Sequence, residues 1–240
     1  METVPSAHFA STIAVCCFAL ITSCSTQNVS AIEGEDDASN LKALRFSMPL
    51  SSPVEGDLEG WGSGVRLEVN KLDGKFDQTL SSGQSIRLDS VLMTGPGTVA
   101  IDFEHTFVGI GFYGGKSKGK FGFDGEVGLG SSLLGAGAVM GGLSDTLHLD
   151  SLGLYFGGAV SLQVLEPLSV FYELKVFAGS NDVEIFTAQL GAKCTPSDVL
   201  SISAGLQSWE YIVERDGIFA IPSDLRLNSE GLFFRLEFAF

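Results

Sequence analysis

The sequence is poor in basic residues and in long apolar runs. Lys and Arg total 14 against 29 Asp and Glu, which gives a formal net charge of −15. An acidic chain repels nucleic acid, so no nucleic-acid partner is expected. Beyond the N-terminal region no apolar run reaches the roughly 20 residues that a membrane helix needs. An α-helical membrane protein is therefore not expected.

Cysteine is also scarce, and its spacing is unsuited to cross-linking or to metal binding. Of four cysteines, Cys16 and Cys17 lie in an N-terminal apolar segment, which leaves Cys24 and Cys194. No CxxC pair occurs, so we expect neither a disulfide framework nor a thiolate metal site. No cofactor is expected.

The apolar segment 9–23 is too short to span a membrane and is typical of the core of a secretory signal. No Lys or Arg precedes Lys42, which is unusual for such a signal. Residues 21–24, Ile-Thr-Ser-Cys, resemble a bacterial lipobox, which would place a lipid on Cys24. Residues 29–31 resemble a small-x-small site, with cleavage after Ala31. Both cleavage sites remain open. We expect a signal peptide over 1–23 and an acidic linker over 24–40.

Strict two-residue alternation of apolar and small or polar residues fills the second half of the chain. The alternation predicts five consecutive strands, each long enough for a tilted membrane crossing of ~9–11 residues. The second face is mostly Ser, Gly, Gln and Ala, which favours a narrow barrel lumen over the water-facing side of a sandwich. The expected strands are 151–164, 168–177, 186–193, 200–207 and 229–240.

The first half alternates less regularly. Strands are expected near residues 44–48, 65–70, 86–88, 99–104 and 118–129, and residues 131–143 could be strand or loop. If both barrel termini lie on one side of the membrane, the strand number is even. Ten strands fit best, and eight is the alternative, with residues 73–97 as one long outer loop and residues 24–61 as a tail. The prediction is one antiparallel transmembrane β-barrel over 41–240.

Charged residues on the second face predict a lumen network. Because buried charges must pair, these side chains would interlock and fill the bore of a small barrel. The predicted network is Glu173, Lys175, Lys193, Arg235 and Glu237. Further inward acids are expected at Asp102, Glu104, Asp124 and Glu126.

Sequence motifs for nucleotide binding or catalysis are weak in this chain. Residues 109–114 match GxGxxG, but the surrounding Gly-rich strand lacks the strand-to-helix context of a nucleotide site. His105 and His148 are expected at the surface or rim, and no catalytic or metal-ligating residue is predicted. The proximity of His148 to Asp145, Asp150 and Ser151 leaves a lipid hydrolase as an alternative. Aromatic residues near strand ends suit interfacial girdles: Trp61, Tyr113, Trp209, Tyr211, Phe238 and Phe240.

The last strand carries the most specific signal. Leu232, Phe234, Leu236, Phe238 and Phe240 share one face, and the chain ends on the aromatic residue. This segment resembles the C-terminal targeting strand of bacterial outer-membrane β-barrels, with Leu236, Phe238 and Phe240 in the targeting positions. The whole chain resembles a small outer-membrane β-barrel of the opacity-protein or porin-like kind.

The resemblance implies a location in the outer membrane of a Gram-negative bacterium, with outer-membrane lipid and the barrel assembly machinery as partners. It also implies a structural or surface-interaction role with a bore filled by charged residues. A narrow porin-like channel is the main alternative to that role, and the lipid hydrolase is the other. The sequence makes no prediction of the oligomeric state.

Overall fold

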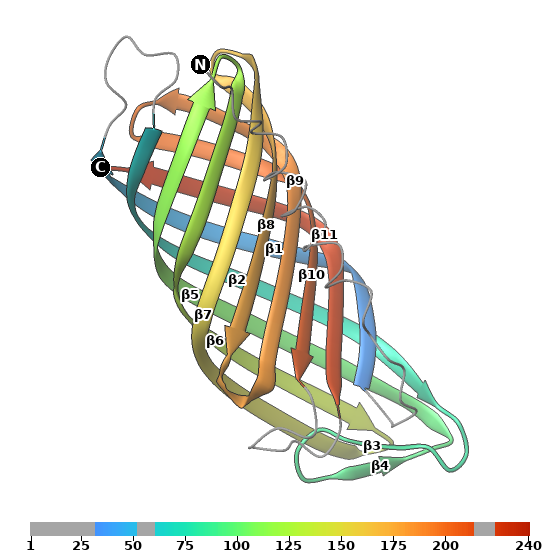
Figure 1. Ribbon diagram of the computed structural model, residues 1–240. Helices are drawn as coiled ribbons and strands as arrows, with labels where there is room; N and C mark the ends of the chain where they lie inside the picture. The colour runs from blue at the N-terminus through green and yellow to red at the C-terminus, as the bar shows by residue number, and fades with distance from the viewer. Residues whose placement is uncertain (1–31, 52–60, 214–223) are drawn as a thin grey trace, which may run out of the picture.

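The part of the chain that the structure describes folds almost entirely into β-strands. The computed structural model describes residues 32–51, 61–213 and 224–240 (Figure 1). The expected signal peptide, Cys24 and Ala31 lie outside the described residues. Within the described ranges the one helical element is a single 3-10 turn, η1 (Ser180–Asp182). None of the helical structure described is long and apolar enough to cross a membrane.

Nine of the described strands form a hydrogen-bonded ring in the order β1-β11-β10-β9-β8-β7-β6-β5-β2. Two further strands, β3 (Ser85–Arg87) and β4 (Leu92–Thr94), form a separate hairpin. The all-β prediction is confirmed. The ring strands are β1 (Ile32–Ser51), β2 (Trp61–Leu80), β5 (Gly97–Lys118), β6 (Phe121–Met140), β7 (Leu143–Leu165), β8 (Leu168–Gly179), β9 (Val183–Ser197), β10 (Leu200–Val213) and β11 (Leu225–Ala239).

The ring differs from the expected ten or eight strands because one neighbour pair is parallel. β1 runs parallel to β11, from the pairing of Ile32 with Leu225 to that of Ser47 with Ala239. Every other neighbour pair in the ring is antiparallel, and an even count follows only if all pairs are antiparallel. The parallel pair therefore permits nine strands. It also places the start of β1 and the end of β11 at opposite ends of the ring.

The two ends of the ring are unlike. At the turn end lie the short β5–β6, β7–β8 and β9–β10 connections and the end of β11. At the lid end lie the β3–β4 hairpin, the β8–β9 turn and the start of β1 (Figure 1). Gly141 and Gly142 join β6 to β7 there with φ of 58° and 87°, a two-residue turn that favours glycine at both positions.

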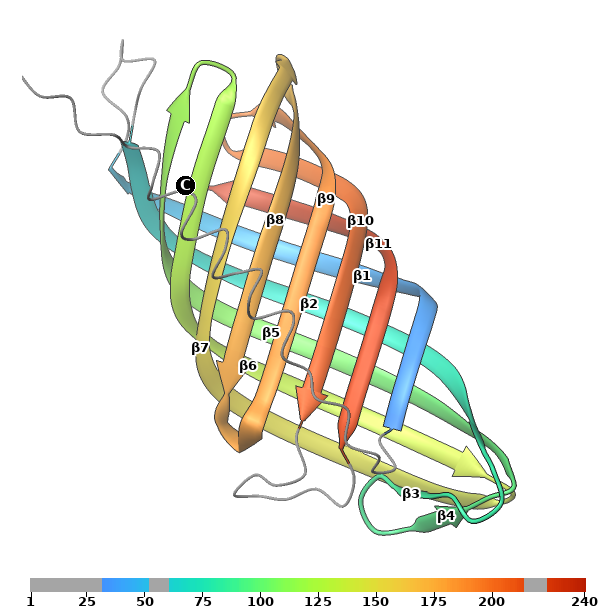
Figure 2. The same ribbon diagram turned by 45° about the vertical axis from the view of Figure 1, so that its right-hand side comes forward.

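Hydrogen bonding closes the ring fully only in its turn-end half. The described pairing of β1 with β2 runs from Ser51–Ser63 to Lys42–Lys71, and beyond this point the two strands diverge toward the lid end (Figure 2). β7 likewise extends past β8, whose pairing with it ends at Gly153–Gly179. β2, β5, β6 and β7 therefore form a taller wall at the lid end.

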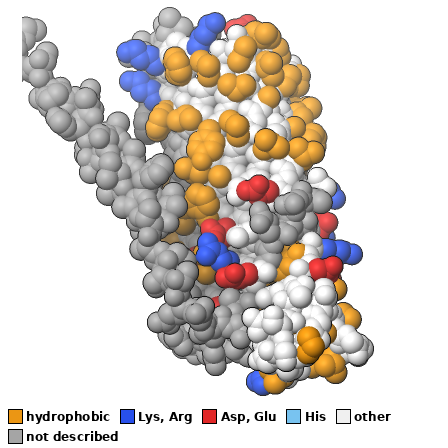
Figure 3. Space-filling view, turned by 90° about the vertical axis from the view of Figure 1, so that its right-hand side faces the viewer, with side chains coloured by type: hydrophobic (Ala, Val, Ile, Leu, Met, Phe, Trp, Pro, Cys, Tyr) orange, Lys and Arg blue, Asp and Glu red, His pale blue; other side chains and the backbone are white. Residues whose placement is uncertain are grey.

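The polarity of the outer surface changes halfway along the ring. Near the turn end the outward side chains are apolar and highly exposed, for example Phe112 (64 %), Phe121 (67 %) and Phe123 (68 %). We call this zone the belt (Figure 3). Toward the lid end the same outward rows become mostly polar or charged, with Val139 and Leu143 as exposed apolar exceptions, and we call that zone the collar. Exposed charged residues of the collar are Asp73, Lys75, Asp77, Asp102, Glu104, Asp150, Glu184 and Glu230.

The polarity of the inward side chains also changes between the belt and the collar. At the level of the belt most inward side chains are charged or polar, with the aromatic rings of Phe171 and Phe233 packed beside Arg235, whereas at the level of the collar they are large and apolar. The collar core includes Leu72, Ile101, Phe103, Leu134, Trp209, Tyr211, Leu225 and Leu227. Each long strand keeps its alternation while the polarity of its two faces is exchanged near its middle.

This exchange overturns part of the predicted orientation of β5. Inward positions for Asp102 and Glu104 would turn Val99, Ile101 and Phe103 outward, but these three residues are buried inside the collar. Asp102 and Glu104 were expected in the lumen, but they lie exposed on the outer surface. Alternation shows which residues share a face, and only the closed ring shows which face is the inner one.

Candidate functional site

Four charged side chains cross the bore at the level of the belt. Arg45 on β1 contacts Glu173 on β8, with 2.7 Å between Nη2 and Oε1. Three strands separate β1 from β8 one way around the ring and four the other way, so this ion pair joins opposite walls. Lys175 on β8 reaches Glu68 on β2 in the same way, at 2.7 Å. These contacts block the bore at this level.

Glu68 is the centre of this cluster. Its carboxylate accepts hydrogen bonds from Arg45 Nε at 2.9 Å, from Lys175 Nζ at 2.7 Å and from Asn70 Nδ2 at 2.5 Å. Only 1 % of the residue is exposed. Arg235 on β11 adds a bond to Glu173 at 2.7 Å and a second one to Gln189. A buried charge is tolerated only when it is paired and hydrogen-bonded, and Glu68 meets this condition.

Two smaller groups lie in the bore beside the central cluster. Arg66 pairs with Glu126 at 2.7 Å, and Tyr155 donates its hydroxyl proton to the same carboxylate at 2.6 Å. Lys193 pairs with Glu237 at 2.8 Å. The inward charges at the belt level therefore balance, with five basic residues against five acidic ones: Arg45, Arg66, Lys175, Lys193 and Arg235 against Glu68, Asp124, Glu126, Glu173 and Glu237.

The structure brings the predicted network together in two parts. Glu173, Lys175 and Arg235 belong to the central cluster, whereas Lys193 and Glu237 form a separate pair. The sequence analysis did not assign Arg45, Arg66 or Glu68 to the network. Alternation around 65–70 places Arg66 and Glu68 on one strand face, and that signal identifies two of the three.

An aromatic layer lies on the collar side of the ion pairs. His105 donates to or accepts from Ser132 Oγ at 3.0 Å and packs 5.1 Å from Trp209, between ring centres. Only 2 % of His105 is exposed, so its predicted surface or rim position is wrong. Trp209 and Tyr211 are buried in the same layer, so they do not belong to an outer girdle.

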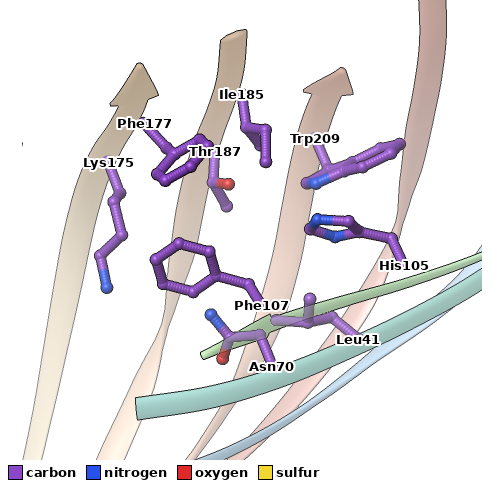
Figure 4. A pocket seen from close by; sticks show the side chains of 9 residues that line it. All are labelled: Leu41, Asn70, His105, Phe107, Lys175, Phe177, Ile185, Thr187 and Trp209. Atoms are coloured by element: carbon purple, nitrogen blue, oxygen red, sulfur yellow. The ribbon is translucent and has the colours of Figure 1, made fainter. Parts of the chain in front are cut away.

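A small cavity of about 20 Å³ separates the ion pairs from this layer. Figure 4 shows that its lining side chains converge from both walls of the ring. The volume suffices for about one water molecule. The lining residues are Leu41, Asn70, His105, Phe107, Lys175, Phe177, Ile185, Thr187 and Trp209.

The residues around His148 do not assemble into one site. His148 and Asp150 are exposed on the outer face of β7. Ser151 is buried on the inner face and donates to the carbonyl oxygen of Ser180 at 2.7 Å. Neighbouring strand positions point to opposite sides of a sheet, so the closeness of these residues in sequence does not become closeness in space.

Asp145 fastens the β3–β4 hairpin over the lid end. Its carboxylate accepts hydrogen bonds from the backbone N–H groups of Asp89, Ser90 and Val91 at 2.8, 3.2 and 3.1 Å. Burial would raise the pKa of the Asp145 carboxyl, but these hydrogen bonds outweigh it and the pKa lies below its usual range. The hairpin, which we call the lid, buries Ile86 and Met93.

No protein family, curated protein or solved structure matches this chain. The fold and the site therefore define it only as an all-β chain with a nine-stranded ring, whose described bore is crossed by ion pairs.

Proposed function

We propose that this chain is an integral outer-membrane β-barrel with a structural or surface-interaction role. The belt lies in the bilayer and the collar projects from it. The observation that carries the proposal is the exchange of polarity halfway along the strands. Apolar outside and charged inside suits hydrocarbon around a closed barrel, whereas the collar has the apolar inside and charged outside of a protein in water.

The height of the belt supports the same proposal. On β11 the outward apolar positions run from Leu232 to Phe240, and on β7 from Leu152 to Val164. A strand tilted by about 45° needs ~9–11 residues to cross the hydrocarbon core. The belt is therefore about one bilayer thick, and the strands continue past it into the collar.

The ion pairs across the bore favour a structural or surface role over conduction. A water-filled ion path needs an open lumen, and a charge-selective one needs an excess of one sign along it. Here opposite walls are in contact and the charges balance. A narrow channel and a lipid hydrolase remain the alternatives, and no contact among the described residues favours the hydrolase.

The test places arginine in the belt. Leu129 and Leu154 are paired, exposed outward positions of β6 and β7. Leu129→Arg with Leu154→Arg should prevent stable insertion, because arginine that faces hydrocarbon costs up to about 2–4 kcal/mol per site, with the highest cost at the bilayer midplane. Insertion is measured by extraction with detergent and by heat-dependent mobility in gels.

The control is the equivalent collar pair. Val139 and Ser144 are paired on the same two strands and also point outward. Val139→Arg with Ser144→Arg should insert normally, because the collar lies in water. A purified wild-type chain that stays monomeric in buffer without surfactant would refute the proposal.

A further inference from the structure

The contact between β1 and β11 closes the ring, and it differs from every other neighbour pair in it. Each other ring contact is antiparallel and joins two strands that follow one another among the ring strands. β1 and β11 pair in parallel over residues 32–47 and 225–239, which we call the seam (Figure 2). A parallel pair is slightly less stable per residue than an antiparallel one, and joining distant segments costs more chain entropy than closing a short turn. The seam is therefore the ring contact that depends most on its side chains.

Three phenylalanine rings stack across the seam on its outer face. Phe46 on β1 lies opposite Phe238 on β11, with 5.6 Å between the ring centres and 19° between the ring planes. The ring of Phe240 lies 6.4 Å from that of Phe46, at an angle of 17°. Every other aromatic contact among the described residues lies inside the ring. Stacked aromatic pairs stabilise a contact beyond the apolar area that they bury.

On the inner face, one carboxylate holds the arginines of both strands of the seam. Arg45 belongs to β1 and Arg235 to β11, and Glu173 reaches them from β8. Its carboxylate accepts a hydrogen bond from Arg45 Nη2 at 2.7 Å and another from Arg235 Nη1 at 2.7 Å. Like charges on neighbouring strands are destabilising, and the shared carboxylate compensates both of them. Glu173 therefore ties the two strands of the seam to one point in the bore.

The two faces together favour one register of the seam. A shift by one residue would turn every side chain of β1 to the other face, so only shifts by two residues keep the belt apolar. One such shift would set Arg45 opposite Arg235 instead of Glu237. The other would set Arg45 opposite Ala239, with no carboxylate across the seam. Of the three registers, the observed one pairs Arg45 with an acid and places Phe46 between two rings.

We propose that the seam is the joint at which the ring opens and closes, and that Phe46 outside and Glu173 inside hold it closed in this register. The inference goes beyond the proposed function, since it gives the terminal aromatic residues of β11 a role in the folded ring besides targeting. Local opening occurs where a segment has few stabilising contacts. β1 meets this condition at the lid end, because its described pairing with β2 stops at Lys42. Opening therefore proceeds from the lid end toward the stacked rings.

The test is amide hydrogen exchange in the full mature chain, folded in detergent micelles. In the wild type, amides that donate across the seam within 42–47 and 234–239 should exchange faster than those within 127–131 and 152–156. The latter ranges pair with each other in the antiparallel β6–β7 contact at the level of the belt. Slower or equal exchange at the seam would overturn the inference, whether or not any variant folds.

Phe46→Leu tests the stack, because leucine keeps the belt apolar and removes the ring. Exchange across the seam should become about twofold to tenfold faster, the range expected for the loss of an aromatic pair. The matched control is Phe234→Leu, at an exposed outward position of the same seam. The ring of Phe234 stacks on no aromatic ring among the described residues, so this variant should leave exchange at the seam unchanged. Equal acceleration in both variants would overturn the role of the stack.

Glu173→Gln tests the inner face. Loss of this charge leaves Arg45 and Arg235 without their shared carboxylate, so exchange across the seam should rise more than exchange in β6 and β7. A uniform rise in all four segments would overturn the role of Glu173 at the seam. A wild-type chain that does not fold in detergent would instead refute the proposed function.

Discussion

At the scale of single residues, the stability of the bore depends on ion pairs between buried side chains that share their partners. Glu68 is buried and accepts hydrogen bonds from both Arg45 and Lys175. Each of these cations has a further carboxylate contact at Glu173, which is 2.7 Å from Arg45 and 3.9 Å from Lys175. Losing Glu68 therefore leaves Arg45 and Lys175 to share Glu173 with Arg235, which is already paired with that carboxylate. Such a loss lowers the free energy of unfolding strongly, because it leaves a buried charge without compensation.

Glu68→Gln should accordingly lower the free energy of unfolding by about 3–5 kcal/mol. The measurement is the temperature at which the folded band is lost in a heat-dependent gel assay, and this temperature should fall. The control is Glu104→Gln, which breaks an exposed pair with Lys71 of 2.6 Å and should cost less than about 1 kcal/mol. Equal shifts in the two variants would contradict a role for burial.

At the scale of elements, the lid is held by one carboxylate and three successive backbone N–H groups. A β-hairpin as short as β3–β4 is not stable alone in water. Its apolar residues Ile86 and Met93 are buried, and Asp145 fixes the loop between its strands. The lid therefore depends on both contacts with the collar.

The hydrogen bonds of Asp145 predict that the stability of the lid depends on pH in the acid range. The pKa of Asp145 is lower in the folded chain than in the unfolded one, so its contribution to stability is complete above the ordinary carboxyl pKa of about 3.9. That contribution is lost as the pH falls through the lowered value. Cleavage by an acid-active protease should therefore rise at low pH in the wild type, and the protection of amides 85–94 from exchange, relative to their intrinsic rates at each pH, should fall.

Asp145→Asn provides the comparison. The amide cannot ionise, so the lid of this variant should be more open at neutral pH and its exchange should lack the acid step. Asp150→Asn, an exposed neighbour on the outer face of the same strand, should behave as the wild type does. An acid step of equal size in Asp145→Asn would assign it to another group.

At the scale of the whole molecule, the bore is filled by two different layers in series. The ion pairs fill it at the level of the belt, and the aromatic and aliphatic core fills it at the level of the collar. A small solute would have to pass both. Removal of one layer leaves the other in place.

Planar bilayers containing the wild-type chain should therefore show no steady conductance. Glu68→Ala with Lys175→Ala removes one ion pair across the bore and leaves the balance of charges in the bore unchanged. This variant should also show no steady conductance, because the collar core remains. Insertion of each sample is checked by its heat-dependent mobility. Steady conductance that this substitution alters would favour the narrow channel.

The sequence by itself determined the strands, the alternation along each strand and the sharing of one face by Glu173 and Lys175. These properties are local, since a strand turns its side chains by the same rule wherever it lies. The tertiary structure alone decided which face is inward, that β1 closes the ring in parallel on β11, and that Arg45 meets Glu173. Each of these depends on segments far apart in the chain, such as those that carry Arg45 and Glu173. The sides of Asp102 and Phe103 are likewise fixed only when the ring closes. Distance in sequence is the physical reason, because no local pattern encodes which distant strand becomes a neighbour.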